Sequence, residues 1–442
     1  MRRLALILVS LLALPAGAQA ASASVGKGLG PAFQGENVVY TQRSGLRTDL
    51  KSLSPAGRSA KLGTLFTDDD PAEDEGGGSN SFSASALAAS DKRIAYGYSS
   101  LFNKVRGFTH NIASLTPGGA GATVASQTGD EFSGPWCGPD IDFGGFDVSA
   151  NAVAYATDNG SCTQQPVTNS ILVADFDAGG KAAALATGAV SGPVRIAGRF
   201  VAFKQSGDVA VFDRAAGTVA YIAGQLDSYD LQDDGKLVGS SAGGALVWFS
   251  AQEPVAHALG ATGSNPRLAG DRVTYVTGGR ASPELRVQPL AGGTPVSLAK
   301  FPANTPIQFD FDGRRAAWRT PGCGLETLQV EEAGGAVAAQ PSAVCAARFG
   351  RASLRARRGL VRIPVSCSTA CAATLSLTGG VRARSVDGLL EPGARQTFRL
   401  TKTSLRRAAR KRRVRIRVRA SVEQVGLGDA KTYSKTYTLR LR

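Results

Sequence analysis

The sequence predicts an all-β protein, a seven-bladed β-propeller followed by a small β-sandwich. Three observations lead to this fold class. A unit of four short β-prone runs recurs along most of the chain, the composition is rich in turn residues, with 54 Gly and a single Met, and charge and patterning change near residue 346. A chain of 442 residues is too long for one ordinary core, so two or more domains are expected.

The clearest copy of the repeated unit runs from Gly192 to Gly224. Branched and aromatic residues there are interrupted by turns that contain Gly, which is the pattern of short strands joined by tight hairpins. The copy therefore predicts four strands, at Pro193–Ala197, Phe200–Gln205, Asp208–Asp213 and Thr218–Ala223. Such a sheet cannot bury both of its faces alone, so it needs copies of itself on either side.

Seven copies of the unit can be aligned. The second run of six copies ends in an apolar residue, a spacer and an aromatic residue, and the remaining copy, at Leu237–Gly239, lacks the aromatic. The aromatic residues are Tyr40, Tyr96, Tyr155, Phe203, Tyr275 and Trp318. The spacing between copies varies from about 36 to about 59 residues, which suits four-stranded propeller blades with variable loops. Closure is expected either from strands at both chain ends, with residues 21–30 as a candidate, or from the last blade alone.

The first 20 residues have the pattern of a secretory signal peptide. A short basic start precedes the apolar stretch Leu4–Pro15 and the small-residue motif Ala18–Ala20. The stretch is too short for a stable membrane span, no second one follows, and no Cys after the motif offers a lipid anchor. We expect a secreted or extracytoplasmic protein with a signal peptide at 1–20, a propeller at 21–345 and a basic β-sandwich domain at 346–442.

Export makes disulfides the expected state of the six Cys. Proximity in sequence favours three pairs among the many that six Cys allow, namely Cys137–Cys162, Cys323–Cys345 and Cys367–Cys371. A metal site is not expected, because the chain has two His and no C-x-x-C pair. The one weak candidate is calcium at Asp68, Asp69 and Asp70, in an acidic insertion whose simpler interpretation is a solvated loop.

One charged constellation emerges when the copies are aligned. The residue just before the apolar residue of the first run is charged in the third to seventh copies and Ala in the first two. These residues are Asp147, Arg195, Asp230, Arg267 and Asp310, with Ala32 and Ala88 in the first two copies. First strands lie innermost in a propeller, so an alternating ring of Asp and Arg is predicted around the channel. The ring either joins neighbouring blades by salt bridges or forms a polar binding cup at one channel mouth.

The repeats also resemble a known family. The segments Ile196–Gly217 and Val148–Gly160, the latter continued by Ser170–Gly180, carry a strand, a turn, V-A-[FY] and a further strand. This pattern resembles the TolB-like, or PD40, repeats related to WD40 propellers, over roughly residues 30–335. The Ser-Pro-Asp-Gly turn of that family is replaced by Ala-Gly-Arg or Ala-Gly-Asp, so the resemblance supports fold more than function. It implies an exported scaffold that binds proteins or small ligands at the face or mouth of the channel.

Residues 346–442 have a different character. They include 24 Lys and Arg against 4 Asp and Glu, about +20, whereas the rest of the chain has 26 against 31, about −5. Alternating apolar residues, as in Val361–Cys367 and Val414–Val422, predict half-buried antiparallel strands, most simply an immunoglobulin-like sandwich. The segment either attracts anionic envelope polymers or is an Arg-biased solvated face. The candidate anionic-surface residues are Arg410, Lys411, Arg412, Arg413, Arg415, Arg417 and Arg419.

Catalytic motifs have little support. Gly239–Gly243 satisfies G-x-S-x-G, but it lies between predicted antiparallel strands, and only His257 follows it. The main expectation is an exported, monomeric, non-catalytic binding or scaffold protein that recognises a protein or glycan through its propeller, without a cofactor. Nucleic acid is not expected, because the chain is exported and aromatic residues near the basic run are few. The alternative is a propeller-type hydrolase or lyase that uses channel carboxylates.

Overall fold

The structure is a computed structural model, and all of its regular elements are strands. No helix occurs in the part of the chain that it describes. That part comprises residues 21–25, 28–44, 47–67, 80–102, 107–116, 121–130, 139–159, 169–305, 307–323, 326–334, 345–351, 354–357, 359–368, 371–381, 383, 385–390, 393, 395–401, 413–423 and 430–441. The predicted signal peptide, Asp68–Asp70, Cys137, Cys162, Arg410, Lys411 and Arg412 lie outside these ranges.

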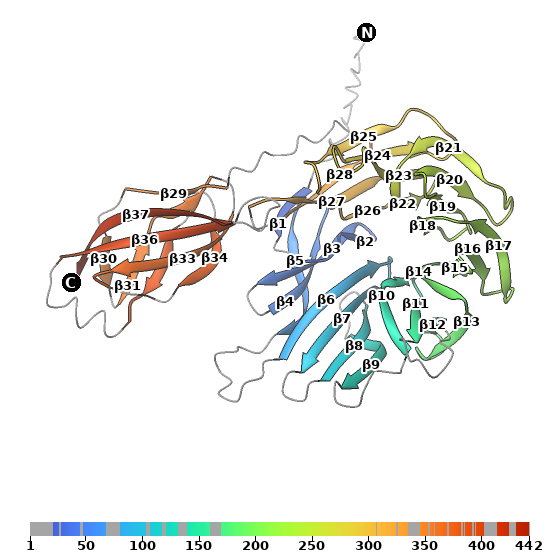
Figure 1. Cartoon of the computed structure of the whole chain (residues 1–442), viewed down its shortest axis with the longest axis horizontal. Coiled ribbons are helices and arrows are strands. Elements are labelled where there is room, and N and C mark those ends of the chain that lie inside the picture. Colours follow the sequence, from blue (N-terminus) through green and yellow to red (C-terminus); the bar gives the residue numbers. More distant parts are fainter. Residues whose placement is uncertain are drawn as a thin grey trace, which may run out of the picture.

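Seven antiparallel four-stranded sheets are arranged as the blades of a propeller (Figure 1). The first three blades are β2 to β5 (Ala32–Gln34, Asn37–Ser44, Arg47–Leu53, Ser59–Thr67), β6 to β9 (Asn80–Ala89, Ile94–Phe102, Gly107–Leu115, Ala122–Asp130) and β10 to β13 (Pro139–Val148, Ala152–Asn159, Asn169–Asp175, Ala182–Gly188). The next three are β14 to β17 (Val190–Ala197, Phe200–Gln205, Asp208–Asp213, Thr218–Gly224), β18 to β21 (Ser228–Leu231, Leu237–Ser240, Ala245–Phe249, His257–Thr262) and β22 to β25 (Ser264–Ala269, Arg272–Thr277, Glu284–Pro289, Val296–Lys300). The seventh contains β26 (Phe309–Phe311), β27 (Arg315–Pro321), β28 (Glu326–Glu332) and β1 (Ala21–Val25).

The hydrophobic cores of the propeller lie between neighbouring blades. In one of them Ile171 and Val173 of the third blade pack with Val194, Ile196 and Phe203 of the fourth. Each sheet thus buries its two faces against two neighbours, as the repeat argument requires. The strands predicted in the fourth blade agree with the structure, except that β14 begins three residues earlier, at Val190 rather than Pro193, and β17 ends one residue later, at Gly224.

The fifth blade lacks the aromatic residue that the other blades carry at the same position. Gly239 occupies this position on β19, and a Cβ placed there would lie 2.4 Å from the Cδ1 atom of Leu226. Leu226 is 4% exposed, and its side chain occupies the space where a side chain at position 239 would begin. A glycine that is conspicuous in the sequence is therefore explained by packing.

The N-terminus closes the propeller. β1 pairs antiparallel with β28, from Ala21 opposite Val330 to Val25 opposite Glu326, and forms the outer strand of the seventh blade. Arg319 on β27 adds a second link. Its Nε donates to the carbonyl of Gly30 (2.8 Å), one Nη donates to the carbonyl of Thr41 (3.0 Å), and the group pairs with Glu326. Of the two modes of closure expected, the structure has the one that joins both ends of the propeller chain.

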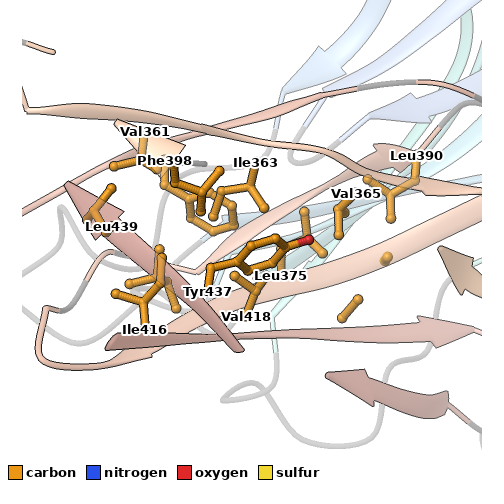
Figure 2. Close-up of a cluster of buried hydrophobic side chains, with 14 of the residues drawn as sticks. Val361, Ile363, Val365, Leu375, Leu390, Phe398, Ile416, Val418, Tyr437 and Leu439 are labelled. Carbon is orange, nitrogen blue, oxygen red and sulfur yellow. The ribbon is translucent and has the colours of Figure 1, made fainter. Parts of the chain in front are cut away.

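A separate C-terminal sheet curls around its own core (Figures 1 and 2). Its strand order is β34 (Val386–Leu390), β33 (Cys371–Gly379), β36 (Arg413–Glu423), β37 (Ala430–Leu441), β30 (Leu354–Arg357), β31 (Leu360–Ile363) and β35 (Gln396–Arg399), and β29 (Ala347–Phe349) pairs with β32 (Val365–Cys367). β30 runs parallel to β37. The predicted fold class, an all-β propeller followed by a small β domain, is confirmed. The immunoglobulin-like relationship of that domain stays a prediction.

Two disulfides meet where the two parts join. Cys323, which follows β27, is bonded to Cys345 with an S–S distance of 2.07 Å, and Cys367 is bonded to Cys371. The carbonyl of Cys323 also accepts a hydrogen bond from the backbone N–H of Ala372, at 2.8 Å. Two of the three pairings predicted from proximity are confirmed, while Cys137–Cys162 lies outside the described residues. The two disulfides indicate an oxidising, extracytoplasmic environment. Within the described ranges no helix qualifies as a membrane span.

Candidate functional site

The five charged residues of the predicted ring surround one cavity of the propeller. They lie near the ends of the innermost strands β10, β14, β18, β22 and β26. The cavity has a volume of about 400 Å³, and its lining includes Asp147, Arg195, Asp230, Arg267 and Asp310 together with Ala32 and Ala88. The charges form an arc over the third to seventh blades, which we call the charged arc, and the two alanines complete the circle.

Each aspartate of the charged arc binds the backbone of the next blade. Asp147 Oδ2 accepts the N–H of Ile196 at 3.1 Å. Asp230 Oδ2 accepts the N–H of Leu268 at 2.8 Å, and Asp310 Oδ2 accepts the N–H of Phe33 at 2.7 Å. These bonds connect the third blade to the fourth, the fifth to the sixth and the seventh to the first. A hydrogen bond from a part-buried backbone N–H to a carboxylate is strong, so these bonds stabilise the contact between neighbouring sheets whose strands do not pair with each other.

The two arginines link the remaining blade pairs of the arc more loosely. Arg195 Nε lies 3.5 Å from Asp230 Oδ1, and Arg267 Nε lies 3.9 Å from Asp310 Oδ1. The side chains of the second pair are 29% and 24% exposed, against 18% and 16% for the first. Of the two aspartates that pair with an arginine, Asp310 is thus held less firmly than Asp230, and part of its carboxyl faces the cavity.

Burial dominates the protonation of the two aspartates at the ends of the charged arc. It raises the pKa of Asp310 to about 6, against the opposing effects of Arg267 and of the backbone N–H groups. It also raises the pKa of Asp147, although Arg195 and the N–H groups of Ile196 and Val148 favour the charged form. Asp147 accepts an N–H on each of its oxygens, at 3.1 and 2.8 Å. Asp310 likewise accepts the backbone N–H groups of Phe33 and Phe311, so both buried carboxyls are held by two backbone donors.

The cavity therefore has two unlike halves. Asp310 and Asp147, from the seventh and third blades, flank a short apolar side formed by Ala32 and Ala88, and the arginines lie on the longer side. Guanidinium groups can hold an anionic or carbonyl group there, and the two buried carboxyls can transfer protons. The described residues contain no cluster of three or more His, Cys, Asp or Glu side chains suited to a metal ion.

Sequence reasoning missed the acceptor role of the aspartates. The alignment placed Asp147, Asp230 and Asp310 at one register position, but it paired them only with arginines. One sequence signal was available. In the next copy, the apolar residue that follows the ring position carries the backbone N–H that donates to the aspartate.

The fold separates the other candidate residues. Ser241 of the G-x-S-x-G pattern lies in the β19–β20 turn, whereas His257 pairs with Trp248 at the far end of β20.

No family model and no curated protein matches the chain. Solved structures do match. Puromycin hydrolase is 12% identical with a TM-score of 0.45, over 77% of this chain and 58% of its own. A prolyl endopeptidase is 11% identical with a TM-score of 0.44, over 79% and 55%. TolB from Acinetobacter baumannii is 13% identical with a TM-score of 0.32, over 67% and 79%.

These matches correct the main functional expectation. The chain spans little more than half the length of the first two proteins, which are hydrolases by name. The leading interpretation, a non-catalytic binding or scaffold protein, is therefore wrong, and the alternative, a hydrolase or lyase, replaces it. Support for that alternative has to come from the channel residues, because a likeness at these identities shows the fold alone. The presence of TolB among the matches accords with the repeat resemblance at the level of the propeller.

Proposed function

We propose that the protein is a propeller-type hydrolase, with a lyase as the variant of the same chemistry, whose catalytic residues are channel carboxyls. One observation carries the proposal. Asp310, whose pKa burial raises to about 6, shares a cavity of about 400 Å³ with a second buried carboxyl, Asp147. A carboxyl that titrates close to neutral pH is suited to general acid catalysis, and such shifts cluster at functional sites.

The proposal gives the two carboxyls complementary roles. Asp147, whose oxygens accept two backbone N–H groups, is the base that takes a proton from water, while the water oxygen bonds to the reacting centre. Asp310 is the acid that donates its proton to the leaving group as the bond to that group breaks. Arg195 and Arg267 bind an anionic or carbonyl oxygen of the substrate. In the lyase variant Asp147 takes a proton from carbon instead of water.

The remaining expectations are part of the same proposal. The protein or glycan expected at the propeller becomes the source of the substrate, and the protein acts as a monomer without a cofactor. It reaches the extracytoplasmic space through a signal peptide at residues 1–20, in keeping with the two disulfides. The C-terminal module is an immunoglobulin-like domain that carries the basic surface.

The test compares D310N and D147N with D227N. Asp227 is an exposed residue of the fifth blade and serves as the matched control. The three variants and the wild type are assayed on chromogenic esters, amides and glycosides and on uronate polymers. We expect an activity that D227N retains and that D310N and D147N each lower by at least about a hundredfold, the range of general acid or base catalysis. An activity that survives both channel variants refutes the assignment, and a wild type inactive on every substrate refutes the proposed function.

A further inference from the structure

The outer face of the C-terminal sheet is covered with arginines. Its strands alternate, so that residues such as Val361, Ile416 and Leu439 point into the core (Figure 2) while their neighbours in sequence are exposed. The exposed arginines come from five strands. They are Arg355 and Arg357 on β30, Arg362 on β31, Arg399 on β35, Arg413, Arg415, Arg417 and Arg419 on β36, and Arg440 on β37.

Strand register brings three of these arginines side by side. The antiparallel pairing of β36 and β37 places Arg413 opposite Arg440, and the parallel pairing of β37 and β30 places Arg440 beside Arg355. Neighbouring strands are about 4.8 Å apart, and like charges on directly opposed residues are destabilising. None of the three guanidinium groups forms an ion pair with a carboxylate of the described residues. Within the described part of the sheet, these opposed arginines therefore form a concentration of positive charge that a bound anion would relieve.

An open groove lies at the Arg413 end of this row. Its volume is about 500 Å³, and its lining consists of Arg351, Arg413, Lys435, Thr436, Tyr437, Thr438 and Arg440. The wall of the groove is held in place, because Lys435 Nζ and Tyr437 Oη both donate to the carbonyl of Gly350, at 3.2 and 2.9 Å. Glu423 is the acid on β36, ten residues from Arg413 and so about 30 Å away along the strand. Among the described residues, the lining of the groove thus offers cations and hydroxyls and no carboxylate.

We propose that this groove, centred on Arg413 and Arg440, binds a linear phosphate polymer. A phosphate group presents several acceptor oxygens, so it can accept from two or three neighbouring guanidinium groups at once, and the Arg fork matches its geometry. From the groove the polymer continues along β36. There Arg415, Arg417 and Arg419 recur about every 7 Å, opposite Thr438, Thr436 and Ser434. The site is distinct from the channel and does not depend on the function proposed for it.

The test measures binding of fluorescently labelled long-chain inorganic polyphosphate to the full chain between about 50 and 200 mM salt. The test variant is R413Q/R440Q. The control, R58Q/K92Q, removes the same charge from exposed turns of the propeller. We expect the test variant to bind at least tenfold more weakly at low salt. The slope of log affinity against log salt should fall by about 1.4, since each lost phosphate contact on a flexible chain accounts for about 0.7. The control should match the wild type.

Several results would overturn the proposal. Equal losses in R413Q/R440Q and the control would mean attraction by net charge alone. Displacement of polyphosphate by polygalacturonate at equal charge would assign the groove to carboxylates, and tighter binding of a single-stranded oligonucleotide would assign it to nucleic acid. Because R413Q/R440Q removes opposed like charges, its melting temperature without polyphosphate should not fall. If it does fall, R415Q/R417Q replaces it, and unchanged binding by that variant also overturns the proposal.

Discussion

Asp230 joins three blades of the propeller, and its replacement by Ala tests the charged arc most directly. Its Oδ2 accepts the N–H of Leu268 in the sixth blade, and its Oδ1 lies 3.5 Å from Arg195 in the fourth. D230A leaves a part-buried N–H without its acceptor, at about 1.5–3 kcal/mol for a bond to a charged group. It also strands Arg195, whose side chain is 18% exposed, so we add only about 1 kcal/mol for the unpaired charge.

The expected loss of unfolding free energy is therefore about 3 kcal/mol, or a fall of roughly 4–5 °C in the melting temperature of a propeller of this size. Differential scanning calorimetry of the full chain measures it. D230N keeps a carboxamide oxygen for the N–H of Leu268 and should lose about half as much. D227A removes an exposed carboxylate from the same blade and should change the free energy by less than about 0.5 kcal/mol. A D230A protein that melts within about 1 °C of the wild type would show that the charged arc does not hold the blades together.

Three further predictions concern pH, closure and packing. The folded-state pKa of Asp310 is raised to about 6 from the ordinary 3.8, so its protonation favours the fold. Protonated Asp310 therefore contributes its full stability below about pH 4, and this contribution, at most about 3 kcal/mol, is lost as the pH rises to about 6. Urea titrations of D310N over the same pH range should not show this loss of stability. R319A removes a buried guanidinium that donates to the carbonyls of Gly30 and Thr41 across the closure and pairs with Glu326 of its own blade, so we expect a loss of about 3 kcal/mol and faster hydrogen exchange in residues 28–41; unchanged exchange there would contradict a role of Arg319 in closure. G239A places a Cβ against Leu226 and should destabilise by about 1–3 kcal/mol, whereas the double variant with L226A should lose less than the sum of the single losses in a denaturation cycle; additive losses would contradict the packing explanation.

The propeller could be predicted from sequence because its signals are local. Short alternating runs, Gly-containing turns and the recurring aromatic position mark strands and hairpins within a few residues of each other. Phe200–Gln205 and Asp208–Asp213 have the same bounds in the sequence analysis and in the structure. The same alignment placed the residues of the charged arc in one register, since a repeat fixes which residue of each inner strand occupies an equivalent position. The two confirmed disulfides join cysteines 22 and 4 residues apart.

What only the tertiary structure decided depends on residues that are distant in sequence. The bond from Phe33 to Asp310 spans 277 residues, and no local pattern predicts such a donor. The raised pKa of Asp310 follows from burial that seven assembled sheets create together. The parallel pairing that places Arg440 beside Arg355 joins the two ends of the C-terminal segment. Sequence by itself determined which elements form and which face of each is buried, because backbone and side-chain preferences act over a few residues. The neighbours of each charge, and so its chemistry, were decided by the closed fold.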